Sequence, residues 1–427
     1  MKTKLLKQKN FLFLVIGSAA STLGSEMQSF ILSLYVLGIT GSGTKFASVL
    51  ALSIVPKIIL GPFAGVFADR FDRKKMMVGL DLISGIIVGI FAIIYSINDG
   101  LSMPYIYVLV ILLSLISLLF APVDMSILPS VVKKEDLPEA NSINFGVART
   151  ASLIAPIVGA ALYGIFGLFI ILIANSISFI LAAISESFIT VPKNTKSDDK
   201  FTVKVFFSDF SEGFKFVLSN RIIMSLIILG LFLNFAGTPM LNIINPYILK
   251  EVIQVSDMQL GSLQSIMMIA MFTSPFICSY LSKKLNTSKI LYLNNLIMGF
   301  IILLIVLVSS PLYLNLFSSN FPPFISMIIA CVLISIICGV NNILLGTILQ
   351  QETPNSMMGR VSSVLNTMLL ASTPLGQMVF GVLLDKISAY ICVAIVSIII
   401  ILSSIMFKVL VISPSQQPEI AIAKEEI

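Results

Sequence analysis

Three ionisable side chains stand inside long apolar runs of this sequence: Glu26, Lys57 and Arg149. An ionisable group in the middle of a helix that crosses a bilayer costs about 2.5 to 3.5 kcal/mol on insertion scales, so each of them is a functional candidate. Glu26 lies about 15 residues into its run, or about 22 Å along a helix. A carboxyl group at that depth can bind and release a proton, because desolvation favours its neutral form.

Glu26 is therefore the candidate proton-binding or cation-binding group. The sequence has no histidine, so a proton relay would depend on carboxylates, and Glu26 is the one acid deep in an apolar run. The alternative is that Glu26 is a structural counter-ion for Arg149 or Lys57 and does not titrate. The acids nearer to the ends of apolar runs are expected at the membrane interface: Asp81, Glu186 and Asp385.

The composition is that of an all-α integral membrane protein. Of the 427 residues, 57% are hydrophobic and 11% are charged, with a mean hydropathy of +1.02. A soluble domain has about one quarter of its residues charged. Apolar runs longer than about 18 residues recur along the chain, and each can cross the hydrocarbon core as a helix. A β-barrel would show short alternating segments instead.

The charge and the cysteines exclude several other classes. The net charge is +6, but the basic residues lie between the apolar runs, which indicates membrane topology rather than nucleic-acid binding. The four cysteines all fall inside apolar runs without metal-like spacing. The sequence thus predicts no disulfide, no metal site and no cofactor.

Apolar runs between polar breaks predict twelve transmembrane helices. The expected ranges are 11–37, 44–68, 75–97, 103–129, 141–163, 166–190, 221–248, 259–281, 289–310, 324–349, 361–384 and 387–411. The longest polar stretch separates the sixth from the seventh. The predicted organisation is a cytoplasmic tail at 1–10, a six-helix bundle at 11–190, a cytoplasmic linker at 191–220, a second six-helix bundle at 221–411 and a cytoplasmic tail at 412–427.

The two halves resemble each other at an offset of about 215 to 220 residues. LPSVVKKEDLPEANS before the fifth predicted helix is similar to LQQETPNSMMGRVSS before the eleventh. Parallel repeats of six helices are an architecture of transporters with a site between the halves. The sequence therefore predicts two pseudo-symmetric bundles.

The basic residues predict the orientation. If the N-terminus is inside, the outside loops hold only three of them, Lys45, Lys250 and Lys386. The positive-inside rule then places both termini in the cytoplasm. The expected location is the plasma membrane, as a multi-pass monomer.

The loop GVFADRFDRKK, residues 65–75, contains six charges between two apolar runs. Gly65 is small and allows a neighbouring helix to approach closely. Asp69 could accept hydrogen bonds from the exposed N–H groups that begin another helix. The best candidate is the predicted eleventh helix, which starts near Gly359 and Arg360. The alternative is that the basic residues of this loop only anchor it on the cytoplasmic side.

The pattern Gly65-x-x-x-Asp69-Arg70-x-x-Arg73-Lys74 resembles the loop signature of the major facilitator superfamily. Within that superfamily the chain looks like the bacterial branch of macrolide and enterobactin exporters, as indicated by GPFAGVFADR, APVDMSILPSVVKKEDLPEANS and GRVSSVLNT. The resemblance implies alternating access between two six-helix bundles. It also implies that Arg73 pairs with Asp124, so that the loop forms a cytoplasmic latch across the halves.

Ala155, Pro156 and Gly159 belong to a degraded form of the family's antiporter motif in the fifth predicted helix. Small residues around a proline allow tight packing and a bend, either for gating or as ordinary packing. The drug-exporter signature of the fourth helix is absent from YVLVILLSLISLLFAP. This absence argues against the best-known multidrug subgroup.

Asn234, Asn242 and Asn341 are candidate substrate contacts, because the resemblance implies that the seventh and tenth helices line the cavity. Polar contact between helices is an equally good explanation for any one of them.

These patterns predict a secondary active exporter of a lipophilic or amphiphilic small molecule, driven by proton or sodium antiport. No Walker A motif occurs, so ATP is not the direct energy source. The alternative is a lysophospholipid flippase or a transport-inactive membrane sensor on the same scaffold. An enzyme is not expected, because the sequence lacks motifs such as HExxH and GxSxG.

Overall fold

The computed structural model describes residues 5–68, 72–190, 203–354 and 357–412, and within these ranges the regular structure is entirely helical. Ten helical stretches are long and apolar enough to cross a membrane. They are Gly43–Gly61, Arg73–Asn98, Met103–Asp124, Leu137–Ser187, Arg221–Val252, Asp257–Ser282, Thr287–Val308, Phe321–Glu352, Met358–Lys386 and Ala389–Val411. The chain is a multi-pass membrane protein.

The chain forms two compact units. Unit 1 consists of residues 1–206 and 255–265, and unit 2 consists of residues 207–254 and 266–427. Unit 1 contains α1 (Lys9–Thr40), α2 (Gly43–Leu52), α3 (Val55–Ala68), α4 (Arg73–Asn98), α5 (Met103–Val131) and α6 (Leu137–Ser187), with short 3-10 turns at Leu5–Lys7 and Lys134–Asp136. The long helix α6 is interrupted at Gly167, which has a φ of 70° and divides it into two segments.

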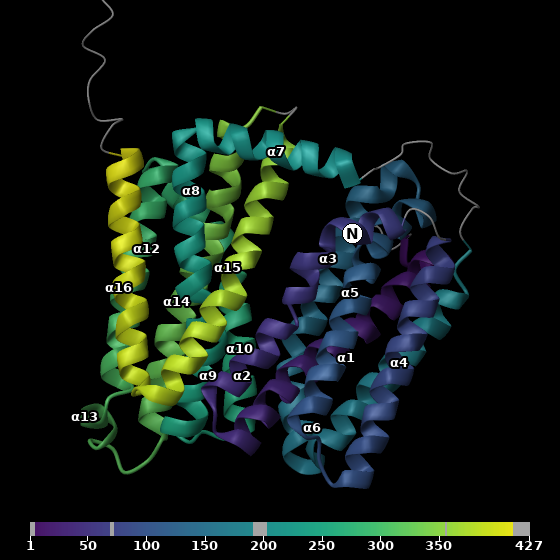
Figure 1. Cartoon of the computed structure of the whole chain (residues 1–427), viewed down its shortest axis with the longest axis horizontal. Helices are drawn as coiled ribbons and strands as arrows, with labels where there is room; N and C mark the ends of the chain where they lie inside the picture. Colours follow the sequence, from purple (N-terminus) through teal and green to yellow (C-terminus); the bar gives the residue numbers. More distant parts are fainter. Residues whose placement is uncertain (1–4, 69–71, 191–202, 355–356, 413–427) are drawn as a thin grey trace, which may run out of the picture. The chain divides into compact units, whose positions relative to one another are not determined.

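Helices α1 and α4 both pack along α6 in unit 1 (Figure 1). Glycines bring the three helices close together: a Cβ on Gly24 of α1 would collide with Ser178 and Asn175 of α6. A Cβ on Gly85 of α4 would lie 3.1 Å from the carbonyl oxygen of Ser176. The Ser176 hydroxyl donates a hydrogen bond of 2.7 Å to the carbonyl oxygen of Gly85. Small residues at such contacts allow helix backbones to approach.

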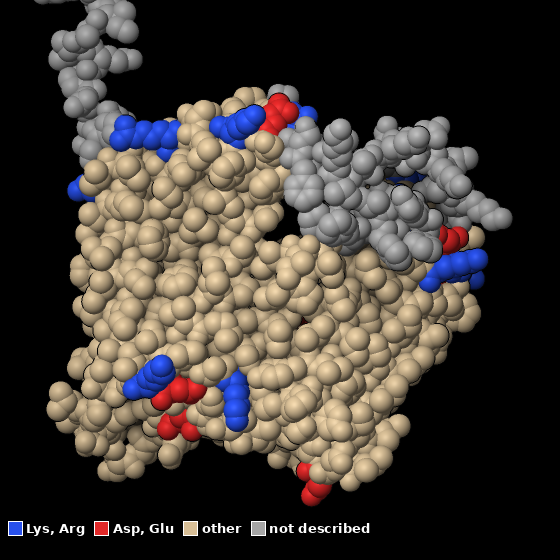
Figure 2. All heavy atoms as spheres, in the orientation of Figure 1, with Lys and Arg blue, Asp and Glu red and all other residues tan. Residues whose placement is uncertain are grey.

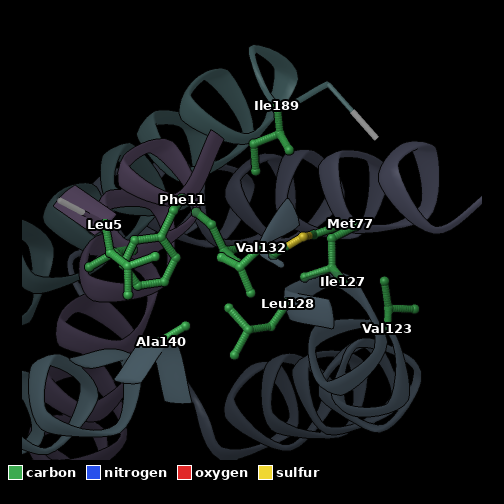
Figure 3. Close-up of a cluster of buried hydrophobic side chains, with 11 residues drawn as sticks. Leu5, Phe11, Met77, Val123, Ile127, Leu128, Val132, Ala140 and Ile189 are labelled. Atoms are coloured by element: carbon green, nitrogen blue, oxygen red, sulfur yellow. The ribbon is translucent and has the colours of Figure 1, made fainter. Parts of the chain in front are cut away.

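One end of unit 1 is closed by an apolar cluster, here called the N-terminal cluster (Figure 3). Its buried members come from the start of the chain and from α1, α4, α5 and α6: Leu5, Phe11, Leu14, Val15, Met77, Val123, Ile127, Leu128, Val132, Ala140 and Ile189. The cluster therefore joins the ends of four helices and excludes water from that end of the unit.

Unit 2 contains most of α7 (Val203–Ser219), which lies in the predicted linker, and the remaining spans. These are α8 (Arg221–Phe232), α9 (Asn245–Tyr247), α11 (Ser274–Ser282), α12 (Thr287–Val308), α13 (Pro311–Leu314), α14 (Phe321–Glu352), α15 (Met358–Lys386) and α16 (Ala389–Phe407), with α10 (Asp257–Met271) divided between the units. On the face of unit 2 that Figure 2 shows, charged side chains lie near the two ends, with an uncharged band between them.

A contact of unit 1 recurs in unit 2. Ser397 of α16 donates a hydrogen bond of 2.8 Å to the carbonyl oxygen of Gly299 on α12, and a Cβ on Gly299 would collide with Ile401. In unit 1, Gly85 contacts Ser176 and Ile180 in the same way. The serines and the isoleucines are each 221 residues apart, and the glycines are 214 residues apart. These offsets agree with the repeat that the sequence predicts.

Replacing Gly24 by alanine tests the packing of α1 on α6. We expect the substitution to lower the free energy of unfolding by about 1 to 3 kcal/mol, because the added methyl group forces Ser178 and Asn175 to move. The measurement is the thermal unfolding midpoint of the purified variant in detergent. Gly38→Ala is the matched control, since Gly38 lies on the same helix with nothing within 4 Å of its would-be Cβ. Equal midpoints for the two variants would contradict the packing argument.

Candidate functional site

A pocket of about 350 Å³ lies within unit 1. Its wall contains Glu26 of α1, Lys57 of α3 and Asp81 of α4. The rest of the wall combines serine hydroxyls with apolar side chains such as Phe120 and Phe179. A pocket with an apolar lining and a few polar and charged groups is typical of a small-molecule site.

The three charges predicted from the sequence act on one another. Glu26 and Lys57 share the pocket wall, and the charges of both Lys57 and Arg149 act on Glu26. Arg149 lies on α6, with its guanidinium carbon 4.9 Å from the centre of the Phe145 ring. Arg149 is exposed and lies outside the pocket wall, so its pairing with Glu26 stays a prediction. That Glu26 titrates stays a prediction.

The amides beside Glu26 hold α1 against α6. Asn175 donates a hydrogen bond of 2.6 Å from Nδ2 to Oε1 of Gln28, and both residues are buried. Ser178 donates to Oδ1 and to the carbonyl oxygen of Asn175. Because Gln28 and Asn175 lie in the pocket wall, the wall is positioned by a polar contact between helices as well as by close packing.

The expectation that Asp81 and Glu186 lie at the depth of the membrane interface stays a prediction, but their side chains do not face solvent. Asp81 is 2% exposed and Glu186 is 0% exposed, so both are buried inside unit 1. Asp385, near the end of α15, is exposed as expected. Position along an apolar run indicates the depth of a residue, but it does not indicate whether its side chain faces a neighbouring helix.

The predicted latch falls partly outside the described residues. Asp69 and Arg70 are not among the described residues, Gly65 lies on α3, and Arg73 is the first residue of α4. Asp124 is half-buried on α5. The pairing of Arg73 with Asp124 stays a prediction.

The same loop contains a helix cap that the sequence analysis misses. The side chain of Asp72 accepts a hydrogen bond of 3.0 Å from the backbone N–H of Lys75 and thereby caps α4. Aspartate directly before a helical run is the usual signal for such a cap.

Arg360 has an ion-pair partner in the predicted linker. Its Nη1 lies 2.9 Å from Oε2 of Glu212 on α7. The two helices also pack closely, because a Cβ on Gly213 would lie 2.7 Å from the carbonyl oxygen of Arg360. The start of α15 is therefore held by α7 within unit 2.

The proline motif of the predicted fifth helix lies on the first segment of α6. Ala155 is fully buried, and Pro156 stands inside the helix. A Cβ on Gly159 would lie 2.8 Å from Cγ of Met27 on α1. These contacts give the motif a packing role within unit 1, and a gating role stays a prediction.

A second pocket, of about 300 Å³, lies within unit 2, and its wall contains Asn234, Asn242 and Asn341. Asn242 is exposed, whereas Asn341 is buried and bonded to two amides of α12. It donates to Oδ1 of Asn295 over 3.0 Å and accepts from Nδ2 of Asn294 over 3.4 Å. Asn341 is thus a contact between helices, while Asn242 has the accessibility that a ligand contact needs.

The seventh predicted helix is irregular where it lines this pocket. It contains three π-helical turns, Leu233–Gly237, Met240–Ile244 and Ile248–Val252, which include Asn234 and Asn242. Such turns are rare and often occur at functional sites. Asn234 donates to the carbonyl oxygen of Gly230 and accepts a hydrogen bond from the Thr373 hydroxyl on α15.

The family is shown by comparison with known proteins. The model of the Major Facilitator Superfamily matches residues 14–376, and the chain belongs to this superfamily. The family and the solved structures named below are transporters rather than enzymes.

Among curated proteins, the chain is 26% identical over 231 residues to the uncharacterized MFS-type transporter YkuC of Bacillus subtilis, covering 52% of this chain and 53% of that protein. It is 24% identical over 225 residues to macrolide efflux protein A of Streptococcus pyogenes, covering 52% and 55%. These matches span about half the length of either relative. The enterobactin exporter EntS of Escherichia coli is 24% identical over 324 residues, covering 74% of this chain and 71% of that protein.

Two solved structures share the fold. A bacterial homologue of the iron transporter ferroportin has a TM-score of 0.73 at 16% identity and covers 97% of this chain and 100% of its own. A bacterial homologue of the human lysosomal transporter Spinster has a TM-score of 0.67 at 14% identity, covering 94% and 96%. At these identities the likeness concerns the fold alone.

Replacing Asn341 by alanine separates helix contact from ligand contact. We expect Asn341→Ala to lower the free energy of unfolding by about 1 to 3 kcal/mol, because it leaves the buried amides of Asn294 and Asn295 without their partner. Thermal unfolding in detergent provides the measurement. The neighbouring Asn342 is exposed, and Asn342→Ala serves as the control with an unchanged midpoint. A midpoint for Asn341→Ala that equals the control would refute the contact role.

Proposed function

We propose that this chain is a secondary active transporter that exports a lipophilic or amphiphilic small molecule by alternating access, as a proton antiporter. The observation that carries the proposal is the unit 1 pocket, in which Glu26 and Lys57 stand in a wall of hydroxyl and apolar side chains. An ionisable group inside a membrane protein is a candidate for a functional role, because its insertion there costs free energy. Membership of the Major Facilitator Superfamily supports transport as that use.

The proposed architecture has twelve membrane-spanning helices in two six-helix bundles. Ten stretches satisfy the criteria of length and composition. The 32-residue α1, which contains the polar residues of the pocket wall, would add one, and the break at Gly167 would divide α6 into two. The recurrence of the serine–glycine contact in both units supports the six-helix repeat. The basic loops support cytoplasmic termini and a plasma-membrane location.

The substrate class follows from the pocket and from the relatives. Hydroxyl groups, aromatic rings and charges in one wall suit a molecule with both polar and apolar surface. Two relatives are named for the export of such molecules, a macrolide efflux protein and an enterobactin exporter. We propose an amphiphilic compound of this kind, in a chain that acts as a monomer.

Coupling is assigned to Glu26. The pocket gives its carboxylate access to water, and Lys57 and Arg149 provide the opposite charge that it needs when ionised. Protonation of Glu26 would release this attraction and change the balance of charge in unit 1. The counter-ion alternative keeps Glu26 ionised throughout the cycle.

Expression in an efflux-deficient bacterium tests the function. We expect raised resistance to erythromycin and reduced accumulation of a lipophilic cationic dye, with both effects lost when an uncoupler collapses the proton gradient. Efflux requires the gradient because the chain has no Walker A motif. Altered lipid asymmetry without any drug or dye phenotype would favour the flippase alternative and overturn the exporter.

The substitution Glu26→Gln tests the coupling role. We expect it to abolish drug-driven proton movement in proteoliposomes that contain a pH-sensitive dye, because glutamine cannot exchange a proton. Glu135→Gln is the matched control, an exposed acid of the same unit that lies outside the pocket wall. If Glu26→Gln retains drug-driven proton movement, Glu26 does not carry the coupled proton, and the counter-ion role is the one that remains.

The substitution Asp69→Asn tests the proposed latch. We expect transport of the same drug to fall while the amount of protein in the membrane is unchanged, because asparagine lacks the charge that favours a helix N-terminus. The measurement is efflux normalised to membrane expression. Transport equal to that of the unsubstituted chain would exclude the latch.

A further inference from the structure

We propose that the buried carboxyl groups of Asp81 and Glu186 hold one proton between them and form a second proton-binding site in unit 1, separate from Glu26. Their use in coupling rests on the proposed function, but the presence of the shared proton does not.

The pair lies between α4 and α6, in the interior of unit 1. Gly85, one turn after Asp81 on α4, contacts Ser176 and Ile180 of α6, so the two helices pack closely beside the pair. Each carboxyl group interacts electrostatically with the other. Asp81 is 2% exposed and Glu186 is 0% exposed. Gly17 of α1 leaves space for the Glu186 side chain, because a Cβ at position 17 would lie 3.1 Å from Cγ and 3.2 Å from Oε1 of Glu186.

Three of the four carboxyl oxygen atoms of the pair are buried without a donor in the described part of the chain. Among the described residues, no donor reaches Oδ2 of Asp81 or either carboxylate oxygen of Glu186. A buried carboxylate without donors is costly, and two in contact repel each other. One proton shared between them removes one charge and provides the missing hydrogen bond, as in other carboxyl pairs that cannot both ionise.

The charged groups around the pair do not provide the positive charge that two ionised carboxylates would need. The charge that acts on both members from a third helix is another carboxylate, Asp124 of α5. From α1 and α3, Glu26 and Lys57 face the pocket that Asp81 also lines, and Lys57 and Glu26 act on each other. On α4 itself, Arg73 lies eight residues before Asp81, about 12 Å along the helix.

The pocket gives the pair one route for proton exchange. Asp81 lies in the pocket wall, whereas Glu186 lies behind it. On the other side stands the N-terminal cluster: Met77 is one turn before Asp81, Val123 precedes Asp124, and Ile189 follows Glu186 by three residues (Figure 3). A proton therefore passes between pocket water and Asp81, and then to Glu186, while the cluster blocks the opposite end.

The site fits a proton better than a metal ion. Among the residues that the structure describes, no three His, Cys, Asp or Glu side chains are placed to hold a metal. A proton needs only the two facing carboxyl groups. Sodium remains an outcome that the experiment distinguishes.

Infrared spectroscopy of the purified full-length chain in lipid tests the shared proton directly. We expect a carbonyl-stretch band of a protonated carboxyl group near neutral pH, with the shift that deuterium oxide causes in such bands. Asp81→Asn and Glu186→Gln should each keep a band of one protonated carboxyl group at a shifted frequency, because the remaining acid is still buried but now faces an amide. The double variant should lose the band. Both substitutions keep the side-chain volume, and size-exclusion chromatography checks that the variants fold.

Glu26→Gln is the matched control and should keep the band that depends on Asp81 and Glu186. A band that survives the double substitution would overturn the proposal, and so would single variants that each keep half of the original intensity, since that result means two separate protons. A band that sodium chloride removes but choline chloride does not would also overturn it, since that result assigns the site to sodium. Erythromycin efflux measured on the same variants keeps the two proposals apart. If the unsubstituted chain shows no erythromycin efflux, the proposed function is wrong. The infrared result alone decides whether Asp81 and Glu186 share a proton.

Discussion

The structure of unit 1 depends on the close approach of α1 and α4 to α6. Gly17 and Gly24 on α1 and Gly85 on α4 each remove the side chain that would separate the backbones. Dispersion and hydrogen bonds replace the hydrophobic effect as the driving force for helix association inside a membrane, and both require short distances. The same glycines make room for the polar groups of α6 that the pocket and the carboxyl pair use.

This constraint also explains how the same serine–glycine contact occurs in both units although the surrounding sequences differ. The serine hydroxyls of Ser176 and Ser397 donate to backbone carbonyl oxygens, at Gly85 and Gly299. A backbone acceptor does not change when side chains change, so the contact needs only one serine, one glycine and a fixed helix spacing. The surrounding residues are free to diverge, and direct comparison of the halves finds only short similar phrases.

The sequence predicted the membrane class and the approximate spans, because each depends on composition or on the length of an apolar run. Ten spans satisfy length and composition, while α1 is more polar because it contributes to the pocket wall. The helix α7 and the ion pair between its Glu212 and Arg360 were not predicted. A charged segment between two apolar runs has the composition of a linker, and its sequence does not show that another helix packs against it. The burial of Asp81 and Glu186 was not predicted, because it depends on which face of each helix meets the neighbour.

The two acidic sites of unit 1 complement each other in charge. With Glu26 ionised and both Lys57 and Arg149 charged, the group around Glu26 has one excess positive charge, and a carboxyl pair that holds a single proton has one negative charge. Asp124, which acts on both members of the pair, is a further carboxyl group in this balance. Because a net charge in a membrane interior is costly, binding of a proton at Glu26 and at the carboxyl pair would be linked through the total charge, without any direct contact between the two sites.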